Sequence, residues 1–252
     1  MTQTGRSTVT KLSAARRRAE SDDRRVADAQ SCDIEGADVV EATVLAHTVV
    51  SHHRGDDPWG RSSTFSKWAG RIAGLRWSVS VGGVRHIPMT GPVLIVCNER
   101  VGGFNPLLAA WALTQECGRV VRFTGVVDIA PLGPLTRKIG GLLSNPQEVS
   151  GALRAGEIVL VSASATRLGR HAGRVDAAHI GAAARLGAPI IPVAAISAPL
   201  SRSARVEVGE IVRPRKQRSG PLLGPELAEA TRLQLQRLLD QTSQTGFSAV
   251  SA

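Results

Sequence analysis

The sequence predicts an α/β fold, with a mixed, mostly parallel sheet flanked by helices. Short apolar runs alternate with helical patterns from Trp77 to Asp240, the order expected when helices connect parallel strands. The run Val93–Cys97 is apolar at every position, which is typical of a strand buried on both faces. The 252-residue chain is 42% hydrophobic and 21% charged, so it contains enough apolar material for a full-sized core.

The N-terminal quarter is expected to lie outside this core. Residues 1–60 mix acidic, basic and polar side chains with little apolar periodicity, which predicts a disordered or loosely helical tail. Residues 61–76 are expected to form a short basic amphipathic helix, because four large apolar residues share one helical face: Phe65, Trp68, Ile72 and Leu75. Two interpretations stay open: this face packs on the core, or it contacts a membrane surface.

Residues 77–242 are expected to form the α/β domain, and residues 243–252 a disordered tail. Strands are predicted where apolar residues alternate or run together, at 77–81, 93–97, 119–123, 157–162, 190–195 and 205–212. Helices are predicted between or after them, at 107–114, 134–139, 149–154, 176–186 and 225–240. Glycines close two of these helices, and a proline opens the last, as is usual at helix ends.

The charge balance restricts the partners. The net charge is +10, which favours anionic partners such as a membrane surface, a phospholipid or a phosphorylated ligand. The chain has no Tyr and only four Phe and four Trp, so few aromatic side chains are available to stack on bases. We therefore expect an anionic membrane surface or phospholipid as partner, and no specific nucleic acid.

Cysteine usage indicates a reducing compartment. Cys32, Cys97 and Cys117 are far apart and form no CxxC pair, which disfavours a disulfide framework and a zinc site. The first 20 residues lack the apolar segment of a signal peptide, and no run reaches 18 apolar residues. The expectation is a cytoplasmic protein, with peripheral attachment to the inner face of the cell membrane as the alternative. No metal or resident cofactor is expected.

Polar residues follow the strand at 93–97 directly. Asn98, Glu99 and Arg100 come next, and two glycines and Phe104 lead into an Ala/Leu-rich helix. A buried strand that ends in polar residues before a glycine-rich turn is where α/β folds place their functional sites. We therefore expect a site at this strand end.

The order of motifs from Trp77 to Pro214 resembles the glycerophospholipid acyltransferase superfamily, whose members acylate lysophosphatidic acid and related acceptors. The resemblance covers about 140 residues and rests on five segments in the family's order. These segments are VSVGGVRHIPMTGPVLIVCN, GRVVRFTGVVDIAPLGPLTRKIGG, ALRAGEIVLVSASATR, GAPIIPVAA and RVEVGEIVRP. It implies an acyltransferase-like fold, and acyl-CoA or acyl carrier protein as a co-substrate.

The resemblance also implies a catalytic dyad that the sequence does not match. The family carries Asn-His followed, after four residues, by Asp, and the His is the base that activates the acceptor hydroxyl. Here Asn98 matches the Asn, but Glu99 stands in place of the His. Phe104 occupies the position of the Asp, and a shift of one residue offers Asn105. Glu99, with Asn98, is therefore the candidate catalytic group.

The family's phosphate-binding motif reads roughly Phe-Pro-Glu-Gly-Thr-Arg, and in this chain it is Ser-Ala-Ser-Ala-Thr-Arg. Thr166 and Arg167 are retained, and Ser164 replaces the Glu. A guanidinium beside a hydroxyl suits a phosphate, so these three residues, with Arg100, are the candidate binding residues. The preceding motif, GGLLSNPQEV, lacks the family's Arg and has Asn145 in that region.

Other groups offer alternatives to Glu99 as a base. A carboxylate becomes basic enough to deprotonate an alcohol only when burial raises its pKa, and Arg100 beside it would lower that pKa. The otherwise expected role of Glu99 is that of a capping or ion-paired residue. His171 follows the Thr-Arg pair within a polar loop and is a weaker candidate, as are His86 and His179. Cys97 is expected to be a buried structural thiol.

Three functions are open at this point. The first is an acyltransferase-superfamily protein of phospholipid and glycerolipid metabolism that is catalytically impaired and binds acyl or phosphorylated lipid ligands. The second is an active acyltransferase that uses Glu99 to move an acyl group from a thioester to a lipid hydroxyl. The third is a basic non-enzymatic scaffold. Function resides in the site, so the fold alone does not decide among them.

Overall fold

A computed structural model describes residues 56–100, 104–125, 132–167, 171–197, 202–213 and 220–248. These residues belong to the compact unit Arg54–Ala252. The predicted tail spans residues 1–60, and its first 55 residues lie outside the described residues.

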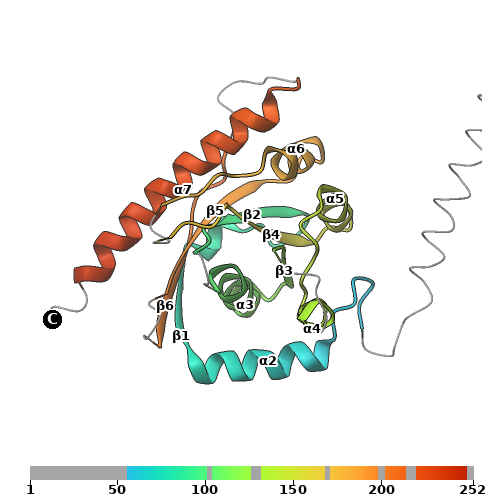
Figure 1. Ribbon diagram of the computed structural model, residues 1–252, viewed down its shortest axis with the longest axis vertical. Coiled ribbons are helices and arrows are strands. Elements are labelled where there is room, and N and C mark those ends of the chain that lie inside the picture. The colour runs from blue at the N-terminus through green and yellow to red at the C-terminus, as the bar shows by residue number, and fades with distance from the viewer. Residues whose placement is uncertain are drawn as a thin grey trace, which may run out of the picture. The chain divides into compact units, whose positions relative to one another are not determined.

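The predicted sheet is confirmed: it has six strands in the order β1-β6-β5-β2-β4-β3 (Figure 1). Every neighbouring pair is parallel except β5 and β6, so the sheet is mixed and mostly parallel. The strands are β1 (Ser78–Gly82), β2 (Val93–Cys97), β3 (Val121–Phe123), β4 (Ile158–Ser162), β5 (Ile190–Ser197) and β6 (Ser203–Val208). Each lies at a position where the sequence predicts a strand.

Helices cover both faces of the sheet, as Figure 1 shows. The helices are α2 (Ser63–Arg76), α3 (Asn105–Cys117), α4 (Leu132–Lys138), α5 (Pro146–Arg154), α6 (Ala177–Arg185) and α7 (Leu223–Ser248), and a short 3₁₀ helix, η1, spans Val84–His86. Helices α5, α6 and α7 lie on one face, which we call the closed face. Helix α3 lies on the other, with α2 beyond it, and we call this the hollow face. Helix α7 extends past Asp240, where the sequence predicts its end.

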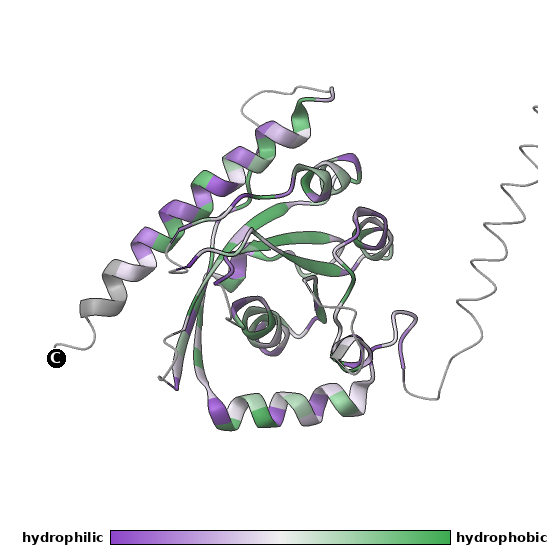
Figure 2. Cartoon of the chain, viewed as in Figure 1, coloured by the Kyte–Doolittle hydropathy of each residue, from purple (hydrophilic) through white to green (hydrophobic). Residues whose placement is uncertain are grey.

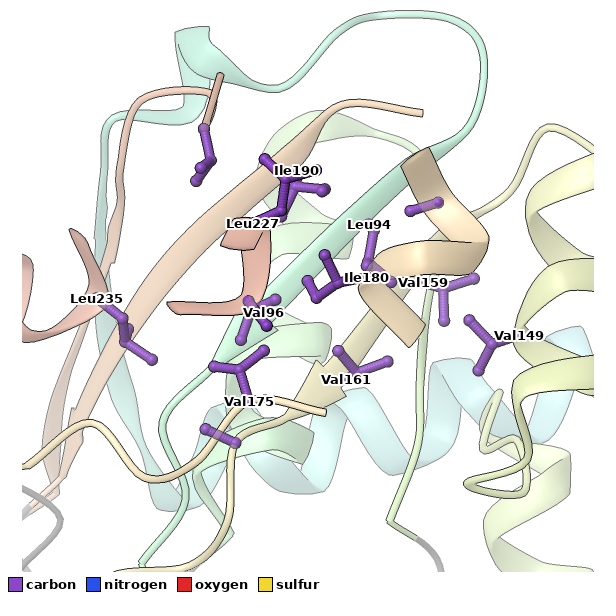
Figure 3. Packing of buried hydrophobic residues seen from close by; sticks show 14 of the residues in the cluster. Leu94, Val96, Val149, Val159, Val161, Val175, Ile180, Ile190, Leu227 and Leu235 are labelled. Atoms are coloured by element: carbon purple, nitrogen blue, oxygen red, sulfur yellow. The ribbon is translucent and has the colours of Figure 1, made fainter. Parts of the chain in front are cut away.

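Alternation along the central strands divides the core into two clusters. On the closed face, Leu94 and Val96 of β2 pack with Val159 and Val161 of β4 and with large aliphatic residues of the helices (Figure 3). On the hollow face, the intervening residues of the same strands pack against α3. Figure 2 shows the central strands as hydrophobic throughout, as expected for strands buried on both faces.

The predicted strand at 205–212 is shorter than expected. Strand β6 ends at Val208, and the chain then turns at Gly209 along Pro192 of β5. The amide of Gly209 donates to the Pro192 carbonyl at 2.8 Å. A Cβ at position 209 would lie only 2.9 Å from the proline ring, so this path requires glycine. Proline offers no amide hydrogen, so the ladder is interrupted where β6 reaches it, and pairing resumes where the Val212 amide donates to the Ile190 carbonyl at 2.8 Å.

The segment before α2 is clamped to the edge strand β3 by a buried arginine. Arg122 is 1% exposed, and its guanidinium contacts Asp57 at 2.6 Å and Glu157 at 3.1 Å. Trp59 covers it, with the guanidinium carbon 5.8 Å from the ring centroid. The other oxygen of Asp57 accepts the amides of Trp59 and Arg61. The clamp therefore fixes where α2 begins.

Candidate functional site

The two segments that carry the predicted site lie side by side. Strands β2 and β4 are parallel neighbours, so the residues that follow them meet at the same edge of the sheet. Pairing continues past the strands: the Cys97 carbonyl accepts the Ala163 amide at 2.8 Å, and the Glu99 carbonyl accepts the Thr166 amide at 3.0 Å. The backbone of Glu99 thus lies beside that of the phosphate-binding candidates.

The β4 segment contains one extra residue in this pairing. Cys97 is opposite Ser162, but the next bridge joins Arg100 to Thr166, so three steps on one side match four on the other. Such a bulge re-aims the side chains next to it. Ser164 and Arg167 are exposed, and Thr166 is half-buried. These binding candidates therefore line an open edge and not a closed pocket.

The segment from His171 to Arg174 runs back along this edge and holds it in place. The Ser164 amide donates to the Arg174 carbonyl at 2.8 Å, and the Thr166 hydroxyl donates to the His171 carbonyl at 3.3 Å. Gly173 packs so closely that a Cβ there would overlap the Ser164 carbonyl. His171 thus lies beside the site edge, and its own side chain is exposed.

Asn98 is committed to the backbone of a neighbouring strand. It is fully buried; its amide nitrogen donates to the Ala195 carbonyl at 3.0 Å, and its oxygen accepts the Ala195 amide at 2.7 Å. These two bonds tie the end of β2 to β5. The side chain therefore positions Glu99, and both its oxygen and its amide nitrogen are engaged in these hydrogen bonds.

The position that the family's Asp would occupy carries no acid and no free acceptor. Phe104 is 65% exposed, and Asn105 is buried. The amide of Asn105 donates to the same Ala195 carbonyl at 3.1 Å, and its oxygen accepts the Ser197 hydroxyl at 3.0 Å. Asn105 thus joins the start of α3 to β5.

The Cys97 thiol is buried close to the Glu99 carboxylate. Burial raises the pKa of the Cys97 thiol well above its ordinary range, and the nearby Glu99 carboxylate raises it further, while a backbone hydrogen bond from Ala195 partly opposes both. The thiol is fully buried and contacts the Asn98 carbonyl at 3.4 Å. The expectation of a structural thiol is confirmed.

The other sequence candidates lie apart from this constellation. His86 contacts the Val208 carbonyl at 3.2 Å through Nδ1. His179 is buried in α6, with its Nδ1 3.4 Å from Asp176. Asn145 caps α5 by accepting the Gln147 amide at 2.9 Å, which gives a structural reason for its place in the second motif.

A cavity of about 280 Å³ lies on the hollow face, and the sequence motifs do not reveal it. It is bounded by the inner side of α2, by α3, by β3 and by Ile139. Phe104, which precedes α3 at the site edge, is one of its lining residues, so the cavity begins next to the site. Its lining is mostly apolar and includes Gly70, Ala73, Leu107, Trp111, Phe123 and Ile139.

Small residues on α2 create this space. A Cβ on Gly70 would lie 3.0 Å from Nε1 of Trp111, so the helix approaches the indole only because residue 70 has no side chain. No side chain of α2 is buried. The large apolar residues Trp68, Ile72 and Leu75 face away from the core and are 58%, 46% and 81% exposed. The interpretation in which this face packs on the core is therefore wrong for these three. The repeat of Gly and Ala on the opposite side was the sequence signal of the cavity.

The comparisons with known proteins support the fold. No protein-family model matches the chain, and no curated protein sequence matches it. Among solved structures, the chain is similar to a 1-acyl-sn-glycerophosphate (LPA) acyltransferase, PlsC, from Thermotoga maritima, with a TM-score of 0.54 and 17% identity. The match covers 81% of this chain and 89% of that one. The α/β fold is thus that of an acyltransferase structure.

Proposed function

We propose that this protein is an acyltransferase-fold protein of phospholipid and glycerolipid metabolism that binds acyl or phosphorylated lipid ligands and lacks efficient acyl transfer. The fold match supports the lipid context. The apolar cavity beside the site offers space for a chain, and the exposed Arg167, next to the half-buried Thr166, offers donors to an anionic head group.

One observation carries the catalytic part of the proposal. A general base needs a partner that orients it and stabilises its protonated form. Two residues lie where the family's Asp would be expected to orient the base. Phe104 has no hydrogen-bond acceptor in its side chain, and the side-chain amide of Asn105 is already bonded to Ala195 and Ser197. Glu99 therefore has no orienting partner from this segment.

The second candidate is an active enzyme with Glu99 as base and acyl-CoA or acyl carrier protein as donor. The placement of Glu99 beside Thr166 and Arg100 favours it, because a reacting head group held there would lie close to the carboxylate. A basic scaffold without lipid ligands is the remaining alternative, and the net charge of +10 is its only support.

An assay of thioester turnover distinguishes the impaired protein from the active enzyme. We expect purified protein, supplied with acyl-CoA or acyl carrier protein thioester and a lysophospholipid, to release no thiol above background, and Glu99→Gln to change nothing. The double variant Glu99→His, Phe104→Asp supplies the missing groups and tests whether the architecture supports transfer. Thiol release by the natural protein that Glu99→Gln abolishes would establish the active enzyme instead.

The outward residues of α2 support peripheral attachment to an anionic membrane. Trp68, Ile72 and Leu75 form an exposed apolar ridge, and Arg71 is exposed on the same helix. Among the described helices, none is both long and apolar enough to cross a bilayer. We expect Leu75→Ser to weaken sedimentation with phosphatidylglycerol vesicles several-fold, because it removes about 1–2 kcal/mol of apolar burial. The matched change Leu233→Ser, at an exposed position of α7, should leave sedimentation unchanged. Equal losses in the two variants, or none, would argue against the ridge.

A further inference from the structure

The cavity under α2 is apolar along most of its length but has cationic residues in its lining. Arg61 and Lys67 line it together with Ser66, and all three lie at or near the start of α2. The lining contains no Asp or Glu. A cavity with two cations, no acid and an apolar interior matches a ligand that has one anionic group and one apolar chain.

Neither cation forms an ion pair with a carboxylate among the described residues. The guanidinium of Arg61 donates to the Ser66 hydroxyl at 3.0 Å, and no acid in the described part of the chain forms an ion pair with it. The nearest acid, Asp57, is engaged by Arg122 and by backbone amides. Burial lowers the pKa of Arg61. The nearby Asp57 carboxylate partly offsets this shift, and the nearby Arg122 guanidinium lowers the pKa further. Within the described residues, Lys67 likewise has no ion-pair partner.

The positions of these groups set the direction of the ligand. Phe104 and Trp77 line the cavity without a charge, whereas the cations come from the first residues of α2 and the segment before it. A chain whose apolar end lay against Arg61 and Lys67 would leave methylenes next to a guanidinium and an ammonium. A chain with its head group at Arg61 and Lys67 instead places the anionic group beside the two cations and the methylenes against the apolar lining.

We propose that the cavity binds a single-chain amphiphile with an anionic head group, held by Arg61 and Lys67, with its chain running under α2 along the apolar lining. This rests on the proposed function in one respect, that the cavity holds a lipid chain. A mostly apolar cavity of about 280 Å³ suits a single chain of medium length.

Calorimetric titration of the full chain with decanoate and with decanol tests the proposal. We expect decanoate to bind about tenfold more tightly than decanol, because only the carboxylate forms charge-assisted hydrogen bonds. Lys67→Gln should weaken decanoate about three- to tenfold and leave decanol unchanged. Arg71→Gln is the matched control: it removes the same charge from the same helix at an exposed position outside the lining, and it should change neither affinity.

Two further arms keep the result interpretable. Ala73→Leu fills the cavity from α2 without adding charge and should abolish binding of both probes while the circular dichroism stays native. Decyl phosphate in place of decanoate distinguishes a phosphate from a carboxylate head group, and tighter binding than decanol by either supports an anionic ligand. If decanol equals both anions, or Arg71→Gln weakens decanoate as much as Lys67→Gln does, the head-group site is overturned and the lipid-binding proposal survives. If no probe binds, both fail.

Discussion

The two faces of the sheet differ in how tightly their helices pack. On the closed face, α5, α6 and α7 fill the space with large aliphatic side chains such as Leu153, Ile180 and Leu235, all at most 1% exposed. On the hollow face, α3 presents mainly Ala and Leu to the sheet, and α2 lies over a cavity with Gly and Ala on its inner side. Close packing stabilises a fold, whereas a site for a ligand requires space.

This difference indicates a division of tasks between the faces. Both faces bury a core cluster: helices α5, α6 and α7 bury one on the closed face, and α3 buries the other on the hollow face. The hollow face leaves α2 without any buried residue and exposes its large apolar side chains. The site edge lies at the carboxyl ends of the strands that separate the two. Substitutions of buried residues on either face should therefore affect stability, whereas substitutions on the inner side of α2 should affect binding.

The largest expected effect is on the closed face. Leu235→Ala should lower the free energy of unfolding by about 3 kcal/mol, because the leucine is 0% exposed and the surrounding helices and strand cannot collapse into the space. Leu233→Ala, two residues earlier in the same helix and 46% exposed, should change it by less than about 0.5 kcal/mol. Urea denaturation of both variants measures the contrast. Equal losses would mean that α7 is not anchored by its buried side.

A pair of glycines tests the comparison at smaller scale. Gly173→Ala should destabilise by about 1–3 kcal/mol, because its Cβ would meet the rigid backbone of Ser164 at the site edge. Gly70→Ala should stabilise by about 0.5 kcal/mol, because alanine favours the helix and Trp111 can shift into the cavity when the new Cβ contacts it. Thermal unfolding of the two variants would sharpen the comparison. A destabilising Gly70→Ala would mean that the hollow face is packed as rigidly as the closed one.

Much of the fold was predictable from the sequence. The strand at 93–97 was placed with its observed bounds, because an unbroken apolar run between turn residues has few other interpretations. The position of Glu99 beside Thr166 was not predicted, because it depends on which strands pair, here β2 with β4. The length of the strand at 205–212 was not predictable, because its end depends on Gly209 meeting Pro192, a contact between residues far apart in the sequence.

The candidate site was less predictable, for two physical reasons. Asn98 and Asn105 both bind the backbone of Ala195, about 90 residues away, and a backbone partner leaves no trace in sequence motifs. Helical periodicity shows that Trp68 and Ile72 share a face but not whether that face is buried. The cavity arises on the other side of α2, where small residues look unremarkable until α3 is seen opposite them.

The smallest expected effect is a dependence on pH that originates on the closed face. His179 is 4% exposed, its Nε2 has no partner among the described residues, and burial lowers its pKa although Asp176 partly restores it. The unfolded chain therefore takes up the proton at a higher pH than the folded chain does. The stability that the neutral imidazole allows is present above about pH 6.5, the ordinary histidine pKa, and is lost as the pH falls from there toward the lowered folded value.

Replacement of this one group isolates its contribution. His179→Gln should unfold with a free energy that changes less between pH 7.5 and pH 5.5 than that of the natural protein, when both are measured by urea denaturation in the same buffers. His171→Gln, at an exposed position beside the site edge, is the matched control and should keep the pH dependence of the natural protein. If the two variants behave alike, acid sensitivity does not come from the closed face. If only His179→Gln loses the dependence of the unfolding free energy on pH, the acid sensitivity originates in the packing of α6. There a buried imidazole takes up a proton only at a cost to the stability of the fold.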